Sequence, residues 1–198
     1  DNEYFYLVGE IYFENRNYES SAIALKKYVT FAESDPETTN WDLATIKRSY
    51  ATTLYELGLF DDALKNLLSA MEHAKLSENF TEIENIYSDL AAIYDATQQF
   101  EQQEKILLQA ISYFENSLPA AEYNWLGARS DLVAYYYRVD RYEDAYPLAY
   151  NILNYFEENL GGPQFAACDV YNPIGLLEQY FGDYELAKNI FKKIIKEA

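Results

Sequence analysis

The side chains of this chain that could carry out chemistry are few and scattered. The sequence contains one histidine, His73, and one cysteine, Cys168. A metal site needs several imidazole, thiolate or carboxylate ligands at suitable spacing, and His73 has no second histidine or cysteine near it. We therefore expect His73 to have a surface or packing role. Cys168 stands before an expected helix in FAACDVYN, where a thiolate could be reactive, but packing as a small buried hydrophobe is favoured.

Adjacent carboxylates are the other candidates, because paired acids can act as general acid and base. Asp61–Asp62 and Glu157–Glu158 have this form. We expect the first pair at the start of a helix, where the helix dipole stabilises negative charge, and the second on a solvated face. The sequence has no glycine-rich phosphate loop and no nucleophile elbow. It therefore predicts a protein that is not an enzyme and holds no cofactor or metal.

The composition is that of a folded and strongly acidic chain. It has 198 residues, of which 49% are hydrophobic, and a formal net charge of −18. This length can bury a substantial core, and no apolar run reaches the roughly 18 residues of a transmembrane helix. The negative charge argues against nucleic acid and against an anionic membrane surface as partners. A single cysteine excludes an internal disulfide framework.

The first residue is Asp1 rather than Met, which indicates a fragment of a longer protein. A leader could have been removed, so the compartment stays open, with the cytoplasm slightly favoured.

A regular repeat organises the elements that would position any site. An aromatic residue, followed three residues later by a mostly small one, recurs at intervals of 42, 40, 42 and 42 residues. These aromatic positions are Tyr18, Phe60, Phe100, Tyr142 and Tyr184. Such constant spacing is the signature of a repeat array.

The residues around each aromatic predict a helical hairpin. Large residues stand ten positions before it, mostly small ones nine before, and mostly apolar ones seven and ten after. Helical spacing gathers such residues into one stripe, and small residues let two helix axes approach closely. Each unit is therefore predicted to contain a first helix, a tight turn and a second helix that starts near the aromatic. Gln103 departs from the small position, which predicts looser packing there, and Glu178 departs from a large position that lies six before the aromatic.

Other residues mark the ends of these helices. Gly58 and Gly182 lie in the predicted turns, where a left-handed cap favours a residue without Cβ. TEIE at 81–84 predicts a capping box at the start of a helix. Pro36, Pro119 and Pro163 interrupt the helical pattern between repeats. The predicted repeats span approximately 2–37, 41–77, 81–117, 120–160 and 164–198, in a single domain over 1–198.

The segments LVGEIYFENRNYESSAIALKKYVTFAESDP and IGLLEQYFGDYELAKNIFKKI resemble tetratricopeptide repeats. The resemblance covers essentially the whole chain. The period of 40 to 42 residues exceeds the usual ~34, as in the longer repeats of kinesin light chain and many bacterial regulators. The resemblance implies an all-α, right-handed superhelix of about five hairpins. Its concave face, lined by the first helices, commonly holds an extended peptide or a partner helix in this family.

The family's groove positions, carried onto this sequence, give a candidate binding surface. It mixes aromatic rings with amides, hydroxyls and charges, a combination that suits peptide recognition. The alternative is that several of the rings only pack on the neighbouring repeat. The candidate residues are Tyr6, Glu10, Phe13, Arg48, Thr52, Tyr55, Asn85, Ser88, Asp95, Ser130, Tyr137, Arg138, Asn172 and Gln179.

The first repeat bears on the kind of partner. Chaperone-binding members of the family grip a C-terminal carboxylate with Lys and Asn, whereas Tyr6 and Glu10 stand at the corresponding positions here. A carboxylate pocket cannot form around Glu10. The excess of acid in this repeat favours a basic protein or peptide segment instead.

The last segment, YELAKNIFKKIIKEA, has an apolar face and no polar capping helix after it. Two interpretations stay open: the array continues beyond it, or the face pairs with a second copy in a homodimer. Binding of this basic helix to a membrane surface is disfavoured by the overall negative charge.

The leading hypothesis is a non-catalytic scaffold that binds a peptide or protein segment in its concave groove. The alternative is a peptide- or ligand-sensing regulatory domain of a bacterial signalling or transcription regulator. The two differ in one observable, because a sensor changes its compactness on binding and a rigid scaffold does not.

Overall fold

A computed structural model describes residues 3–159 and 168–197 of the chain. Within these ranges the chain forms ten α-helices and no strand. Pro163 lies outside the described residues, as do the side chains of Glu157, Cys168 and Asn172. The helices are α1 (Glu3–Glu14), α2 (Tyr18–Ser34), α3 (Asn40–Glu56), α4 (Phe60–Leu76), α5 (Phe80–Ala96), α6 (Phe100–Glu115), α7 (Glu122–Arg138), α8 (Tyr142–Asn159), α9 (Cys168–Phe181) and α10 (Tyr184–Glu197).

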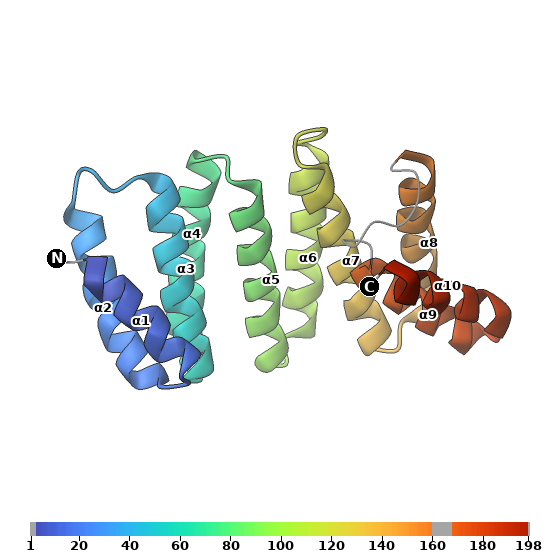
Figure 1. Ribbon diagram of the computed structural model, residues 1–198, viewed down its shortest axis with the longest axis horizontal. Coiled ribbons are helices and arrows are strands. Elements are labelled where there is room, and N and C mark those ends of the chain that lie inside the picture. Colours follow the sequence, from blue (N-terminus) through green and yellow to red (C-terminus); the bar gives the residue numbers. More distant parts are fainter. Residues whose placement is uncertain (1–2, 160–167, 198) are drawn as a thin grey trace. The chain divides into compact units, whose positions relative to one another are not determined.

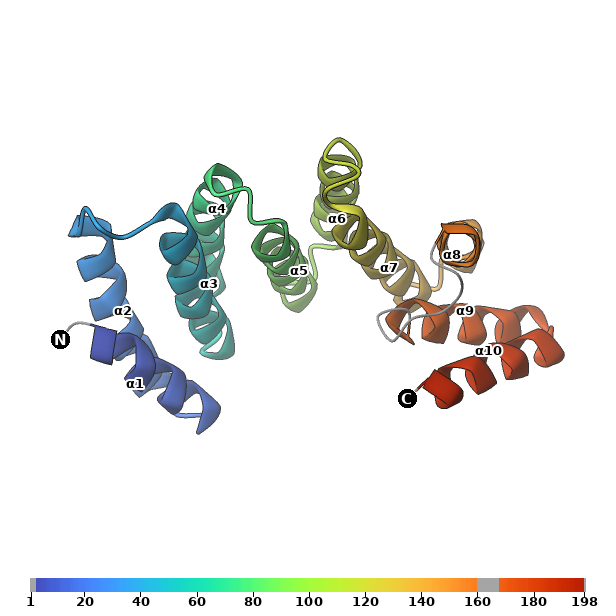
Figure 2. The ribbon, with the colours of Figure 1, turned by 45° about the horizontal axis from the view of Figure 1, so that its top comes forward.

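The helices belong to two compact units, residues 1–106 and 107–198, with the boundary inside α6. In the first unit, α1 pairs with α2 and α3 pairs with α4, while α3 also contacts α1, α2 and α5 (Figures 1 and 2). The first helices of successive hairpins, α1, α3 and α5, are thus neighbours. In the second unit α7 pairs with α8, α9 pairs with α10, and α9 also contacts α7 and α8. The single domain over 1–198 stays a prediction.

The recurring aromatic is the first residue of the second helix in each hairpin, as the repeat predicts. In every hairpin the residue two positions before it has a positive φ, and the next backbone N–H donates to the carbonyl oxygen five residues back. This is the Schellman arrangement, which satisfies the last carbonyl groups of the first helix. Gly58 and Gly182 occupy the left-handed position in two turns, as predicted. In the other hairpin turns it is held by Arg16 (58°), Gln98 (57°) and Asp140 (60°).

Capping at the start of the first helices differs in part from the expectation. The predicted capping box at 81–84 is wrong, because α5 starts at Phe80 and the Asn79 side chain accepts the Glu82 N–H. A capping box is present at α3, where Thr39 and Asp42 bond each other's backbone N–H groups. The Asn79 cap was missed because Asn79 and Thr81 are both suitable N-cap residues and both are followed three residues later by a glutamate.

Small residues let the two helices of the first hairpin approach closely. Gly9 of α1 faces Leu25 of α2, and a Cβ built on Gly9 would lie 2.6 Å from both Cγ and Cδ2 of Leu25. Leu25 is 0% exposed, so its side chain has little space into which it could move. The small residue nine positions before the aromatic is therefore a packing requirement here.

We expect Gly9→Ala to lower the free energy of unfolding by about 1–2 kcal/mol. Overpacking of a dense core costs roughly 1–3 kcal/mol, which exceeds the gain of up to ~1 kcal/mol from replacing a helical glycine by alanine. Urea denaturation of both proteins gives the difference. Leu25→Val in the Gly9→Ala background should recover part of the loss. A Gly9→Ala protein more stable than the wild type would show that the contact carries no strain.

The two departures from the repeat are both buried. Gln103 is 5% exposed and Glu178 is 1% exposed. The Tyr146 hydroxyl of α8 donates a hydrogen bond of 2.9 Å to Glu178 Oε1 of α9. The polar residue at 178 is therefore matched by a tyrosine on the neighbouring helix.

Candidate functional site

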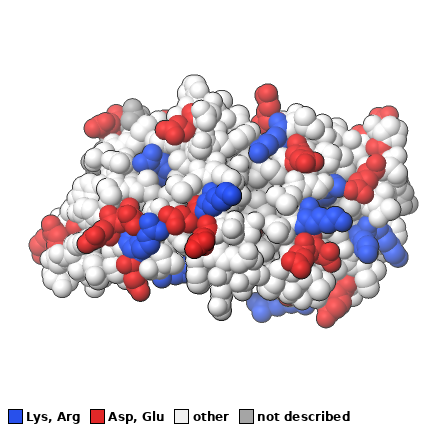
Figure 3. Space-filling view, turned by 180° about the vertical axis from the view of Figure 1, so that it is seen from behind, with Lys and Arg blue, Asp and Glu red and all other residues white. Residues whose placement is uncertain are grey.

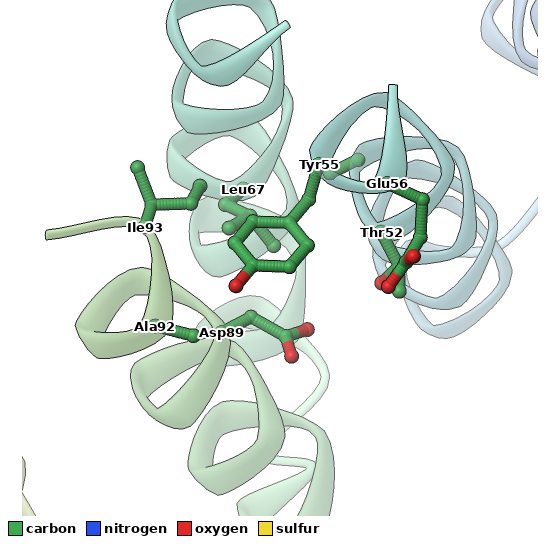
Figure 4. A pocket seen from close by; sticks show the side chains of 8 residues that line it. Thr52, Tyr55, Glu56, Leu67, Asp89, Ala92 and Ile93 are labelled. Carbon is green, nitrogen blue, oxygen red and sulfur yellow. The ribbon is translucent and has the colours of Figure 1, made fainter. Parts of the chain in front are cut away.

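A hollow of about 220 Å³ opens between α3 and α5 of the first unit (Figure 4). Its lining combines an aromatic ring, two carboxylates, a hydroxyl and apolar side chains. These residues are Ala51, Thr52, Tyr55, Glu56, Leu67, Asp89, Ala92 and Ile93. The volume is smaller than the roughly 300–1,000 Å³ of pockets for drug-sized ligands, and it suits a single side chain.

Helical spacing explains why these side chains meet. Thr52, Tyr55 and Glu56 stand at i, i+3 and i+4 on α3, which places them on one face. Residues 89, 92 and 93 repeat this spacing on α5. Leu67 of α4 is 1% exposed and forms an apolar floor, while Ala92 is small and leaves the mouth open.

The Tyr55 ring is held from behind by a second aromatic. Tyr55 and Phe60 pack edge to face, with ring centroids 5.6 Å apart. Figure 4 shows the Tyr55 ring beside Leu67 and Asp89 at the opening. A ring fixed in this way offers contact area at a low cost in side-chain entropy.

Charged side chains join α3 to α5 next to the hollow. Arg48 Nε donates to Glu82 Oε1 at 2.8 Å, and its Nη1 lies 3.4 Å from Asp89 Oδ2. Glu82 is 7% exposed, whereas the Arg48 and Asp89 side chains retain 29% and 31% exposure. Arg48 therefore pairs closely with the buried Glu82 and lies at a longer distance from Asp89, the acid that lines the hollow.

The Asp89 carboxyl is not in an ordinary environment. Burial raises the pKa of Asp89 to about 6, and Glu82 acts in the same direction, while Arg48 opposes the shift. Close by on α1, burial raises the pKa of Glu10. At neutral pH the pocket carboxylate is thus charged but poorly solvated, a state that an incoming cation would stabilise.

The structure brings together part of the predicted surface in the first unit. Thr52 and Tyr55 line the hollow. Arg48 is not a lining residue, but it contacts Asp89, which is one. The Thr52 hydroxyl is already bonded to the Arg48 carbonyl at 3.0 Å. Asp89 was missed, although an isolated acid in the apolar stretch IYSDLAAIY was a usable signal.

Other predicted residues of this unit lie on α1 and α5. Tyr6 is half-buried, with its hydroxyl 3.4 Å from Ser49 Oγ, and Phe13 packs against Tyr18 at 5.4 Å. These two rings thus pack within the unit, as the alternative interpretation holds. Asn85, Ser88 and Asp95 are half-buried on α5.

In the second unit the predicted residues have mixed environments. Ser130 is 9% exposed and its hydroxyl donates to the Leu126 carbonyl, so it is not offered to a ligand. Tyr137 packs against Tyr142 at 5.3 Å. Arg138 and Gln179 are exposed. Asn172 lies in α9, and its side chain is outside the described residues.

The second unit has its own hollow of about 350 Å³. It lies between the α7–α8 turn and the end of α9 and is wide and mixed in polarity. Its lining residues are Asp140, Arg141, Tyr142, Glu143, Asp144, Tyr180 and Phe181.

Among the described residues, no cluster of three His, Cys, Asp or Glu side chains could hold a metal ion. His73 Nδ1 lies 2.8 Å from Asn40 Oδ1, which gives it a local hydrogen-bonding role. None of the described helices combines the length and the apolar composition that a bilayer-spanning helix needs. On the face seen in Figure 3, Lys and Arg side chains lie beside Asp and Glu side chains.

Solved structures with a similar fold cover nearly the whole chain. A putative kinesin light chain of Podosopora anserina with nearly identical TPR-like repeats matches 98% of this chain and 93% of its own, at 14% identity and a TM-score of 0.70. The chain has the tetratricopeptide-type fold. The all-α solenoid class and the family resemblance predicted from the sequence are thus confirmed at the level of the fold.

Two bacterial structures share the tetratricopeptide-type fold over about half of their own length. A Rap conjugation gene regulator of plasmid pLS20, in complex with the Phr* peptide, matches 98% of this chain and 52% of its own, at 12% identity and a TM-score of 0.65. Aspartyl phosphate phosphatase F of Bacillus subtilis matches 99% and 59%, at 13% identity and a TM-score of 0.66. Because proteins with this fold include a phosphatase, the fold does not decide about catalysis.

Comparisons by sequence add no further relative. No family model matches the chain, and no curated protein matches it.

Proposed function

We propose that the face formed by α1, α3 and α5 binds an extended peptide or protein segment, without catalysis. The observation that carries the proposal is the hollow between α3 and α5, where the Tyr55 ring and the apolar floor at Leu67 lie beside two carboxylates. Its position on adjacent first helices supports a segment that runs across them. The Phr* peptide of the pLS20 regulator gives this fold a precedent for peptide ligands.

We propose further that the segment is basic at the residue that enters the hollow. Glu56 and Asp89 border it, and Glu10 lies on the adjacent helix. The stem of a Lys or Arg side chain can pack on Tyr55 and Leu67 while its charge meets the carboxylates. Asp89 would then regain the stabilisation that burial removed.

An array of extended peptides that differ in one position, each Lys, Arg, Gln, Leu or Glu, tests this specificity. We expect binding to the Lys and Arg members and a loss of at least 10-fold in affinity for the others. Tyr55→Ala should weaken binding by a similar factor, because it removes the wall on which the stem packs. Tighter binding of the peptides that carry Glu or Leu at this position would contradict the proposal.

Control variants separate loss of the site from loss of the fold. Trp41→Ala removes another aromatic of α3, 53% exposed and absent from the lining, and should leave the affinity unchanged. Tyr55→Phe keeps the ring and should retain most of the binding. Equal losses in the Trp41 and Tyr55 variants would place the contact elsewhere.

A sensing domain is the second candidate, and the gene regulator with this fold favours it. Small-angle scattering with and without a bound peptide from the array distinguishes the two roles. An unchanged radius of gyration supports a rigid scaffold, and a change supports a sensor.

A further inference from the structure

Two positions of the repeat are exposed in the first hairpin and buried in the later hairpins wherever the structure describes the side chain. They lie 14 and 7 residues before the recurring aromatic. The earlier position is held by Tyr4 (63% exposed), Ile46 (4%), Ile86 (0%) and Ala128 (2%). The later position is held by Ile11 (47% exposed), Thr53 (0%), Ile93 (3%), Tyr135 (5%) and Leu177 (0%).

The second hairpin shows what covers these positions. Ile46 packs with Val29 and Ala32 of α2. Thr53 Oγ1 lies 3.3 Å from Ser21 Oγ, also of α2. The second helix of one repeat thus buries this face of the next repeat's first helix.

No described helix takes that place against α1. Tyr4, Leu7 and Ile11 stand at i, i+3 and i+7, so they form one stripe, and Leu7 is 60% exposed. The later repeats carry a polar residue or proline where this one has Leu7. An apolar stripe of this kind marks an interaction surface.

The charges of α1 and α10, and the place of α10 in its hairpin, indicate which helix would cover the exposed stripe of α1. The sequence of α1 holds three glutamates and no Lys or Arg, whereas that of α10 holds four lysines and two glutamates. α10 is the second helix of its hairpin, the element that covers a following first helix. Ala187 of α10 stands three residues after the aromatic, where α2 has Ser21. A pair of α1 faces would instead bring like charges together.

We propose that the exposed stripe of α1 takes α10 of a second copy of the chain, head to tail. The stacking of repeats then continues from one molecule into the next. This contact uses residues other than those of the proposed peptide site, so an experiment can contradict one of the two proposals and leave the other standing.

Sedimentation velocity and light scattering over a range of concentrations test the proposal. We expect the mass of the wild type to rise with concentration. Leu7→Glu/Ile11→Glu should block the α1 side and Lys188→Glu/Lys192→Glu the α10 side, each leaving a monomer. The control Leu68→Glu changes a leucine of α4 that is 52% exposed and should associate as the wild type does.

A mixture of the two blocked variants gives the decisive result. Each retains the surface that the other lacks, so a 1:1 mixture should form a dimer and nothing larger. A mixture that stays monomeric, or an α1 variant that still associates, overturns the proposal. A wild type that stays monomeric at every concentration also overturns the proposal. The stripe would then be covered by a helix that does not come from a second copy of the chain. Tyr55→Ala should lose peptide binding and keep association.

Discussion

Arg48→Met is expected to lower the free energy of unfolding by about 2–4 kcal/mol at pH 7. Removing one partner of a buried ion pair costs roughly 3–5 kcal/mol, since the other charge stays buried, and the partial exposure of Arg48 reduces this. Glu82 loses its 2.8 Å partner, and Asp89 is left near Glu82 without a cation. Urea denaturation of the variant and the wild type measures the difference.

The loss should depend on pH in a defined direction. Burial already raises the pKa of Asp89 to about 6 from an ordinary 3.8, and without Arg48 it should rise further. A carboxyl whose folded-state pKa is raised binds protons more readily in the folded state, so its contribution to stability grows as the pH falls from about 6 towards 4. The cost of Arg48→Met should therefore be smaller at pH 5 than at pH 7.

Asp89→Asn is the matched control for this effect. It removes a poorly solvated charge and should stabilise the protein at pH 7 by an amount on the order of 1 kcal/mol, after allowance for its exposure. In the Asp89→Asn background, Arg48→Met should cost less and lose much of its pH dependence. An equal cost in both backgrounds would show that Asp89 and Arg48 are not coupled.

Glu178→Ala is expected to lower the free energy of unfolding by about 3 kcal/mol. The substitution leaves a cavity at a position that is 1% exposed, and it leaves the Tyr146 hydroxyl without the acceptor 2.9 Å away. Truncating a buried large side chain costs roughly 2–5 kcal/mol, and losing the hydrogen bond of the half-buried Tyr146 hydroxyl adds roughly 0.5–1.5 kcal/mol. Thermal and urea unfolding followed by circular dichroism measure the loss.

Two further variants distinguish the lost hydrogen bond from the lost volume. Glu178→Gln keeps an acceptor and should cost less than Glu178→Ala. Glu178→Leu with Tyr146→Phe replaces both polar groups and should be close to the wild type, since apolar pairs often substitute for buried polar ones without loss. If this double variant is as unstable as Glu178→Ala, the burial of position 178 has another basis.

Several features of the fold followed from local physical rules. Each second helix starts at its recurring aromatic, because the repeat spacing and the turn chemistry act within a few residues. The same rules placed Asp61 and Asp62 in the first turn of α4. They failed at the start of α5, where asparagine and threonine were both suitable caps within three residues.

The candidate site could be predicted only in outline. Thr52 and Tyr55 were predicted to lie on one face of α3, and both line the hollow, because helical spacing fixes which side chains of α3 point together. Asp89 was not found, because its partial burial in the hollow and its contact with Arg48, 41 residues away, arise only when α3 and α5 pack together. That the predicted residues bind a peptide stays a prediction.

Helix bounds, turns and the repeat itself depend on residues that are close together in the sequence, so the amino-acid order was enough to predict most of them. Which polar groups meet was decided by packing between helices, as in the contacts of Asp89 with Arg48 and of Glu178 with Tyr146. The same holds for the exposure of Tyr4 and Ile11, whose described equivalents in later repeats are buried. Burial depends on what lies against a face, and that is a property of the assembled helices rather than of any one segment.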